Sequence, residues 1–154
     1  LEEAFIKAQV AAYQSEIKEG YVFIGVTDQD KQEMIPAALE FQQAGRKILA
    51  TAGTFEVLKK AGVTNIEKTS LDRNAVGNIF EYLDRDEVAL IVNTTRSRKR
   101  SIDATHIRRV ALLNNMPYFT TVEGTLNLAR ALVATDSGKN LNYQPLPLPQ
   151  KIAS

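Results

Sequence analysis

A short polar turn at residues 51–54 carries the groups best suited to holding an anion. Its sequence is Thr-Ala-Gly-Thr, and it lies between an apolar run typical of a strand and a pattern typical of a helix. Gly53 lets the backbone turn tightly, and the free N–H groups of a helix start carry a partial positive charge, to which the hydroxyls of Thr51 and Thr54 add donors. The turn therefore suits a phosphate, although an ordinary helix start capped by Thr51 or Thr54 has the same composition.

Lys31 is a cation expected beside the edge of the fold where a ligand would bind. It lies close to the start of the helix that follows the first predicted strand. A positive charge at this place opposes the helix dipole, so it needs either solvent or an anion beside it. The sequence leaves both interpretations open: a solvated surface lysine, or a lysine that binds an anion at the edge of a sheet.

Polar residues follow the most apolar run of the chain. Asn93, Thr94 and Thr95 come directly after residues 88–92 and can hydrogen-bond a base, ribose or phosphate, or can simply end a strand. A basic group follows at once, consisting of Arg96, Arg98, Lys99 and Arg100. This group can hold a phosphate, steer anions, contact a partner domain or be a solvated loop. No aromatic residues interleave with these cations, so a nucleic-acid site is disfavoured.

No catalytic constellation emerges from the remaining reactive residues. His106 is the only histidine, no cysteine is present, and no nucleophile-elbow motif accompanies a serine. A lone histidine without clustered carboxylates also gives little support to a metal site. We interpret His106 as a structural residue of a helix, and we expect neither catalytic residues nor metal ligands in this chain.

Strands and helices alternate strictly along the sequence. Apolar runs predict strands, and apolar residues spaced three or four apart predict helices. The predicted strands cover residues 21–26, 47–50, 63–68, 88–92 and 117–120. The predicted helices cover residues 28–43 (from Asp28 or Asp30), 53–62, 74–83, 103–114 (capped by Asp103) and 122–133. This alternation predicts an α/β fold, an open five-stranded parallel sheet with helices on both faces, whose ligands bind beyond the carboxyl ends of the strands.

The chain has the size and composition of one domain. It has 154 residues, 44% of them hydrophobic, and its 19 basic residues nearly balance 18 acidic ones. This balance indicates neither a general nucleic-acid surface nor a membrane surface, and no apolar run is long enough to span a bilayer. Glu2 and Glu3 do not fit a signal peptide. Because the chain begins without Met and within a helical pattern, we interpret it as a piece of a longer protein or a trimmed chain.

Several segments, taken together in order, resemble one known family. They are residues 1–9 (Leu-Glu-Glu-Ala-Phe-Ile-Lys-Ala-Gln), 51–54 (Thr-Ala-Gly-Thr), 93–95 (Asn-Thr-Thr), 107–109 (Ile-Arg-Arg) and 120–121 (Thr-Thr). Their order and approximate spacing are similar to those of the C-terminal regulatory domain of the large subunit of carbamoyl-phosphate synthase. The resemblance covers about residues 1–135 and implies the methylglyoxal-synthase-like fold. It implies a linker helix at residues 1–18, a regulatory domain at 19–136 and an irregular tail at 137–154.

The resemblance also implies a function. Bacterial members of the family bind UMP as an inhibitor and IMP as an activator, and they relay the effect of ornithine to the synthetase domains. By resemblance, the effector-binding residues are Lys31, Thr51, Gly53, Thr54, Lys68, Asn93, Thr94, Thr95 and Asp103, and Thr120 belongs to the ornithine relay. The implied partners are the synthetase domains and a small glutaminase subunit of a cytoplasmic ligase that uses ATP with Mg or Mn ions. No cofactor is expected in this piece itself.

The sequence departs from the family at three positions and leaves two rival interpretations. Gly25 replaces a common serine, Ala52 a common histidine and Ala104 a common serine, so the preferred nucleotide is open. One rival is a small lyase of the same fold that uses Asp72 or Asp103 as a base on a phosphorylated triose, although residues 71–75 lack the catalytic loop of methylglyoxal synthase. The other is an interaction domain that docks a partner on the apolar helix face at residues 1–12.

Overall fold

Five parallel strands form the central sheet of the protein. The computed structural model describes residues 17–94 and 101–140, with the side chains of residues 101–104 and 135–140 left out. The strands are β1 (Tyr21–Gly25), β2 (Ile48–Thr51), β3 (Ile66–Thr69), β4 (Val88–Asn93) and β5 (Tyr118–Phe119), and they lie in the order β3-β2-β1-β4-β5. Strands β1, β2 and β3 follow one another toward one edge of the sheet. β4 then pairs with the free side of β1, so the strand order reverses between β3 and β4. The predicted open parallel sheet is confirmed.

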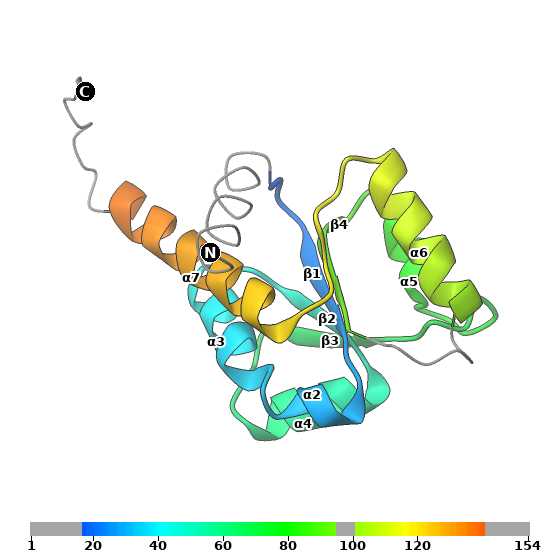
Figure 1. Ribbon diagram of the computed structural model, residues 1–154, viewed down its shortest axis with the longest axis horizontal. Helices are drawn as coiled ribbons and strands as arrows, with labels where there is room; N and C mark the ends of the chain where they lie inside the picture. The colour runs from blue at the N-terminus through cyan, green and yellow to red at the C-terminus, as the bar shows by residue number, and fades with distance from the viewer. Residues whose placement is uncertain (1–16, 95–100, 141–154) are drawn as a thin grey trace.

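Helices cover both faces of this sheet (Figure 1). On one face α3 (Ile35–Gln43) and α7 (Val122–Asn140) pack against each other, and on the other lie α5 (Ile79–Asp84) and α6 (Ser101–Leu113). Two short connections place α2 (Asp28–Lys31) and α4 (Ala52–Lys60) in contact with each other beyond the ends of β1 and β2. This arrangement positions two helix starts at the carboxyl edge of the sheet.

The two faces of the sheet bury separate apolar clusters. Ile24, Ile48 and Leu90 are fully buried beneath α3, α4 and α7, with Met34, Phe41, Leu58 and Leu128. On the other face Phe23, Leu49 and Ile91 are fully buried with Ile79 and Ile107 from α5 and α6. Neighbouring residues of a strand thus point into different layers, which is why the central strands are continuous apolar runs. β4 is buried along its whole length.

The predicted helix at residues 28–43 is two helices. α2 ends at Lys31 and α3 begins at Ile35, with Pro36 in its first turn. Proline has no N–H to donate to the carbonyl four residues earlier, so it is tolerated only near a helix start. The prediction that Asp28 or Asp30 caps this helix is also wrong, because Thr27 occupies the N-cap position of α2 and its hydroxyl donates to Asp30.

The predicted helix at residues 74–83 begins five residues later, at Ile79. Val76, which lies within the predicted helix, is 99% exposed in the preceding loop. Asn78 is the N-cap of α5, and its side-chain oxygen accepts hydrogen bonds from the N–H groups of Phe80 and Glu81. Gly77 before it has φ of +77°, a conformation that favours glycine and stops a helix from extending backwards.

The helix boundaries in the last third also differ from the prediction. Asp103 does not cap α6, which begins at Ser101. α7 continues through Asn140, beyond the predicted end at Val133, so residues 137–140 do not belong to an irregular tail. Gly138 interrupts the apolar pattern, but an isolated glycine costs a helix only about 1 kcal/mol and does not end it. Residues 1–16 of the linker helix predicted at residues 1–18 and the tail from residue 141 lie outside the described residues, and Ile17 and Lys18 belong to neither a helix nor a strand.

No helix among the described residues is long and apolar enough to cross a membrane.

Candidate functional site

Polar side chains from several strand ends meet at the carboxyl edge of the sheet. Thr51 at the end of β2 pairs with Thr69 at the end of β3, and Gly25 at the end of β1 pairs with Asn93 at the end of β4. Because β1 lies between β2 and β4, Gly25 separates Thr51 from Asn93. This edge therefore presents threonine and asparagine side chains on either side of a glycine.

The turn at residues 51–54 forms the start of α4. Thr51 occupies the N-cap position in an extended conformation, yet its side chain makes no capping hydrogen bond. Its hydroxyl instead donates to Thr54 Oγ1 at 3.3 Å, and Thr54 is fully buried. The first N–H groups of a helix have no acceptor within the helix, and Ala52 and Gly53 are exposed. The helix start is thus open to an external acceptor.

Lys31 lies directly against this helix start. A Cβ atom built on Gly53 would be 2.9 Å from Lys31 Nζ, so the ammonium group occupies the space that any other residue's side chain would need. Lys31 forms an ion pair with Asp28, and the Lys31 side chain is only 17% exposed while that of Asp28 is 94% exposed. Lys31, Thr51, Gly53 and Thr54, predicted separately from the sequence, are therefore brought together at one place.

A cavity of about 630 Å³ opens beside this turn. It is lined by Thr51, Ala52, Lys68, Thr69, Ser70, Leu71, Asp72 and Arg73. Lys68, on β3, is exposed, with Nζ 5.3 Å from the centre of the Phe55 ring. The cavity thus brings Lys68 into the same wall as Thr51, and it lies over the carboxyl ends of β2 and β3.

Asn93 and Thr94 lie on the other side of Gly25 and are mostly buried. Thr94 Oγ1 accepts a hydrogen bond from the N–H of Thr27 at 3.3 Å, and the N–H of Thr94 donates to the carbonyl of Gly25 at 3.2 Å. Burial raises the pKa of the Tyr118 hydroxyl, and a hydrogen bond with Asn93 opposes this rise. Both residues therefore hold β4 to its neighbours, and their contact with a ribose stays a prediction.

The remaining predicted residues are placed less completely. Thr95 and the basic group at residues 96–100 lie outside the described residues. The backbone of Asp103 lies in the first turn of α6, but its side chain is not described. Thr120 is exposed between β5 and α7, immediately after the buried Phe119.

The loop at residues 70–78, whose residues 70–73 form one wall of the cavity, was not predicted from the sequence as part of the effector site. The Asp72 carboxylate accepts from the N–H of Asn74 at 2.9 Å, and the Asn78 amide donates to the carbonyls of Arg73 at 3.1 Å and Ala75 at 2.8 Å. These bonds give the loop a defined shape without helix or strand. Asn78 ahead of an apolar pair was the sequence signal, since asparagine is a strong N-cap.

Arg73 connects this loop to the helices behind it. Its guanidinium carbon lies 3.9 Å from the centre of the Phe80 ring on α5, and Nη2 contacts His106 Nε2 on α6. Phe80 and His106 also contact each other edge to face, with ring centres 5.2 Å apart. His106, interpreted from the sequence as structural, is therefore half-buried beside a cation that lines the cavity.

Gly25 is explained by its neighbour Phe23. A Cβ atom at residue 25 would lie 2.9 Å from Cζ of the Phe23 ring. Phe23 is fully buried in the layer under α5 and α6, so its ring has little room to move. The missing hydroxyl at residue 25 is thus a consequence of the aromatic side chain two residues earlier on the same strand.

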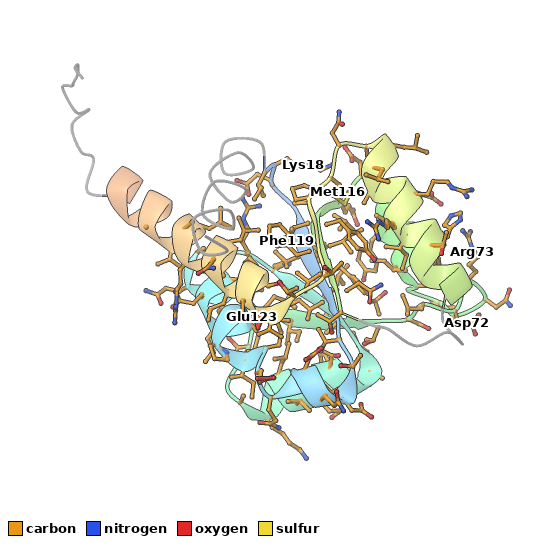
Figure 2. All side chains as sticks on the ribbon, viewed as in Figure 1. Lys18, Asp72, Arg73, Met116, Phe119 and Glu123 are labelled. Atoms are coloured by element: carbon orange, nitrogen blue, oxygen red, sulfur yellow. The ribbon has the colours of Figure 1, made fainter. Side chains whose placement is uncertain are left out.

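Two further cavities lie at the opposite, amino edge of the sheet. One, of about 610 Å³, is lined by residues that include Lys18, Leu112 and Met116, and the other, of about 540 Å³, by residues that include Arg46 and Glu87. Figure 2 shows Asp72 and Arg73 at the opposite end of the sheet from Lys18 and Met116. Of these three cavities among the described residues, the one at the carboxyl edge contains residues predicted to bind an effector, and the other two do not. Among the described residues, no three His, Asp or Glu side chains gather closely enough to hold a metal ion.

Comparison with known proteins identifies the relatives of this chain. The family model described as the MGS-like domain matches residues 33–120, more than half of the chain. The carbamoyl phosphate synthase large chain of Methanothrix thermoacetophila is 37% identical over 129 residues, which are 84% of this chain and 12% of that protein. That of Rhizobium meliloti is 34% identical over 145 residues, which are 93% of this chain and 12% of that protein.

A shorter relative is itself described as one section of a large chain. The "carbamoyl phosphate synthase large chain, C-terminal section" of Aquifex aeolicus is 31% identical over 147 residues, which are 93% of this chain and 27% of that protein. The chain thus spans only a small part of the length of these relatives. Its parallel sheet and its match to the family model agree with the fold implied by the sequence resemblance. The chain belongs to the MGS-like domain family, and its relatives are large chains of carbamoyl phosphate synthase.

Proposed function

We propose that this chain is the regulatory domain of a carbamoyl phosphate synthase large chain and that it binds nucleoside monophosphates at the carboxyl edge of its sheet. The observation that carries the proposal is the position of Lys31 against the start of α4, beside Thr51 and Thr54. A phosphate placed there meets the N–H groups of a helix start, an ammonium group and a hydroxyl. Helix starts bind phosphate in this way in P-loop and dinucleotide-binding proteins, where backbone N–H groups and the helix dipole favour an anion.

The ion pair between Lys31 and Asp28 is compatible with this role. Asp28 is almost fully exposed, so its carboxylate holds the ammonium group at little cost and can give way to a ligand. A bound phosphate then takes the place of Asp28 as the anionic partner of Lys31, and it also accepts hydrogen bonds from the N–H groups at the start of α4. In this proposal the base extends into the cavity past Lys68, and the ribose lies toward Asn93, Thr94, Thr95 and Asp103.

In this proposal the chain itself performs no catalysis. UMP acts as an inhibitor and IMP as an activator by shifting the balance between arrangements of this domain and the synthetase domains, and Thr120 takes part in the response to ornithine. A ligand shifts such a balance only by the difference in its affinity for the two arrangements, typically about 1–3 kcal/mol. The small glutaminase subunit belongs to the same assembly, which we place in the cytoplasm.

Calorimetric titration of the 154-residue chain with UMP and with IMP tests the proposal. We expect saturable binding of at least one nucleotide, and a loss of about tenfold or more in affinity in Lys31→Ala and in Thr51→Ala, because each removes a donor to a charged group. Lys60→Ala, a change to an exposed lysine in the last turn of α4, is the matched control. Absence of heat with both nucleotides contradicts the proposal and favours an interaction domain without a ligand.

A second candidate is a lyase, and one observation favours it. Elimination of phosphate from a triose phosphate needs a base and a group that binds the anion. The Asp72 carboxylate, which can serve as the base, lines the same cavity as the cationic Lys68 and Arg73. Incubating the chain with dihydroxyacetone phosphate and measuring released phosphate decides between the two. Steady turnover that disappears in Asp72→Asn establishes the lyase and excludes the regulatory proposal.

A further inference from the structure

Arg73 is held in place by two aromatic rings from two helices. Phe80 of α5 lies beneath one face of the guanidinium, 3.9 Å from its central carbon, and His106 of α6 contacts Nη2 at its edge. Such contacts restrict a side chain that would otherwise sample many rotamers. Arg73 is nevertheless exposed and lines the cavity beside Lys68 and Asp72. Its orientation is therefore fixed before any ligand arrives.

The known contacts of Arg73 leave most of its donors unused. A guanidinium carries five N–H donors, and the ring nitrogen of His106 accepts from only one of its nitrogen atoms. Among the side chains that the structure describes, no carboxylate forms an ion pair with Arg73, and the adjacent Asp72 carboxylate accepts from the N–H of Asn74. A preorganised, planar set of donors thus borders a cavity that is also lined by Thr51 and Ala52, the first two residues of the turn at residues 51–54.

The cavity is larger than a phosphate requires. Its volume of about 630 Å³ falls within the range of sites for small organic molecules. Thr51 and Ala52 form one part of its wall and residues 70–73 form another. A nucleotide whose phosphate meets the Thr51 turn therefore has room to place its base along the loop that carries Arg73.

We propose that Arg73 is a specificity-determining residue that selects bases with a keto oxygen at the position where other bases carry an amino group. This inference rests on the proposed function. Its chemical basis is that a guanidinium only donates: it pairs with the carbonyl at C6 of hypoxanthine or C4 of uracil, whereas the amino groups of adenine and cytosine at these positions are themselves donors. Arginine fits the purine O6 and N7 acceptors with two parallel hydrogen bonds.

Calorimetric titration with matched ligands tests the role of Arg73. The ligands are IMP against AMP, UMP against CMP, and ribose 5-phosphate, which lacks a base. We expect the chain to prefer the keto member of at least one pair by about tenfold, as one lost charge-assisted hydrogen bond implies. Arg73→Ala should abolish this preference and leave the affinity for ribose 5-phosphate unchanged, and Arg73→Lys, which keeps the charge but not the planar donors, should restore little of it.

Arg85 provides a matched control variant. Its guanidinium also lies over an aromatic ring, 5.1 Å from the centre of Tyr82, and it is exposed, but it does not line the cavity. Arg85→Ala should retain the full preference for keto bases. An unchanged preference in Arg73→Ala, or equal affinity for both members of each pair in the unmodified chain, overturns the inference and leaves the proposed function standing. If neither a nucleotide nor ribose 5-phosphate binds, the inference and the proposed function both fail.

Discussion

At the scale of single residues, the absence of a side chain at Gly53 decides where the charge of Lys31 lies. The ammonium group occupies the space beside the Gly53 Cα, at the start of α4. Lys31 and Gly53, more than twenty residues apart in the sequence, thus lie against each other. This arrangement makes glycine at residue 53 a requirement of the proposed anion site rather than of the helix, because the residue is exposed within α4 and adopts no left-handed conformation.

Gly53→Ala should therefore change stability and binding in opposite directions. Alanine is the better helix former by up to about 1 kcal/mol, and the end of a lysine side chain can move aside at little cost. The displaced ammonium no longer meets a phosphate at the helix start, so affinity for nucleotide should fall severalfold. Chemical denaturation and calorimetric titration of the same sample measure the two effects. Equal or tighter nucleotide binding in Gly53→Ala contradicts the placement of Lys31 in the site.

The residues of the candidate site were predictable to different degrees. Lys31 and Thr51 follow strands with strong apolar patterns, so their place at the carboxyl edge followed from alternation along the chain. Arg73 was not predictable, because its position depends on Phe80 and on His106, which lies 33 residues further along. No pattern of neighbouring residues predicts a contact between the loop before α5 and α6, because β4 separates them in the sequence.

At the scale of elements, the buried strands were the most reliable predictions and the polar connections were the least. β1, β2 and β4 match continuous runs of apolar residues, and such runs are typical of strands that are buried on both faces. β3 is half polar, with Glu67 and Lys68 exposed, and its observed bounds are shifted by one to three residues from the prediction. Periodicity also missed the break before α3 and the late start of α5, because it detects an apolar face and not the backbone groups that begin a helix.

A polar cluster ties three of these elements together away from the site. The Tyr21 hydroxyl at the start of β1 donates to Glu67 on the edge strand β3 at 2.7 Å, and Tyr82 on α5 lies 3.4 Å from the same carboxylate. Tyr21 and Tyr82 contact each other edge to face. This hydrogen bond, together with burial, raises the pKa of Tyr21 from 10.0 to about 12.

Stability should consequently fall as the pH rises from 10 to 12. In this window the unfolded chain releases the Tyr21 proton while the folded chain retains it, so ionisation favours the unfolded state. Urea denaturation between pH 9 and 11 measures the trend, and Tyr21→Phe, which lacks the titrating hydroxyl, should show a shallower fall. Identical pH dependence of the two proteins argues against a strengthened Tyr21–Glu67 bond in the folded state.

At the scale of the whole molecule, the sheet separates two kinds of surface. The carboxyl edge carries the candidate effector site, and the amino edge carries two other cavities and the exposed Leu112 and Leu113 at the end of α6. The relatives are far longer than this chain, which covers 12% of the first two described above. Effector binding in our proposal acts on domains beyond this one, and by linkage those domains alter effector affinity by the same factor.

The isolated chain should still register the ligand as a gain in thermal stability. A ligand present at one hundred times its dissociation constant stabilises the folded state by about 2.7 kcal/mol, which corresponds to a rise in Tm of roughly 5–10 °C for a domain of this size. Thermal unfolding with and without IMP or UMP measures this rise. Lys31→Ala, with an affinity lowered tenfold or more, should show about half this rise or less at the same nucleotide concentration, and an equal rise places the binding elsewhere on the molecule.

The close approach of Phe23 to Gly25 restricts the order in which substitutions can accumulate in this domain. Serine at residue 25 meets the buried aromatic ring, so Gly25→Ser alone should cost about 1–3 kcal/mol, as overpacking in a core does. Replacing Phe23 by leucine first leaves room for the new side chain. The two changes are therefore expected to be non-additive, with the double variant more stable than the sum of the single effects predicts. A mutational path that adds a hydroxyl to the floor of the site must begin with a change in the core beneath it.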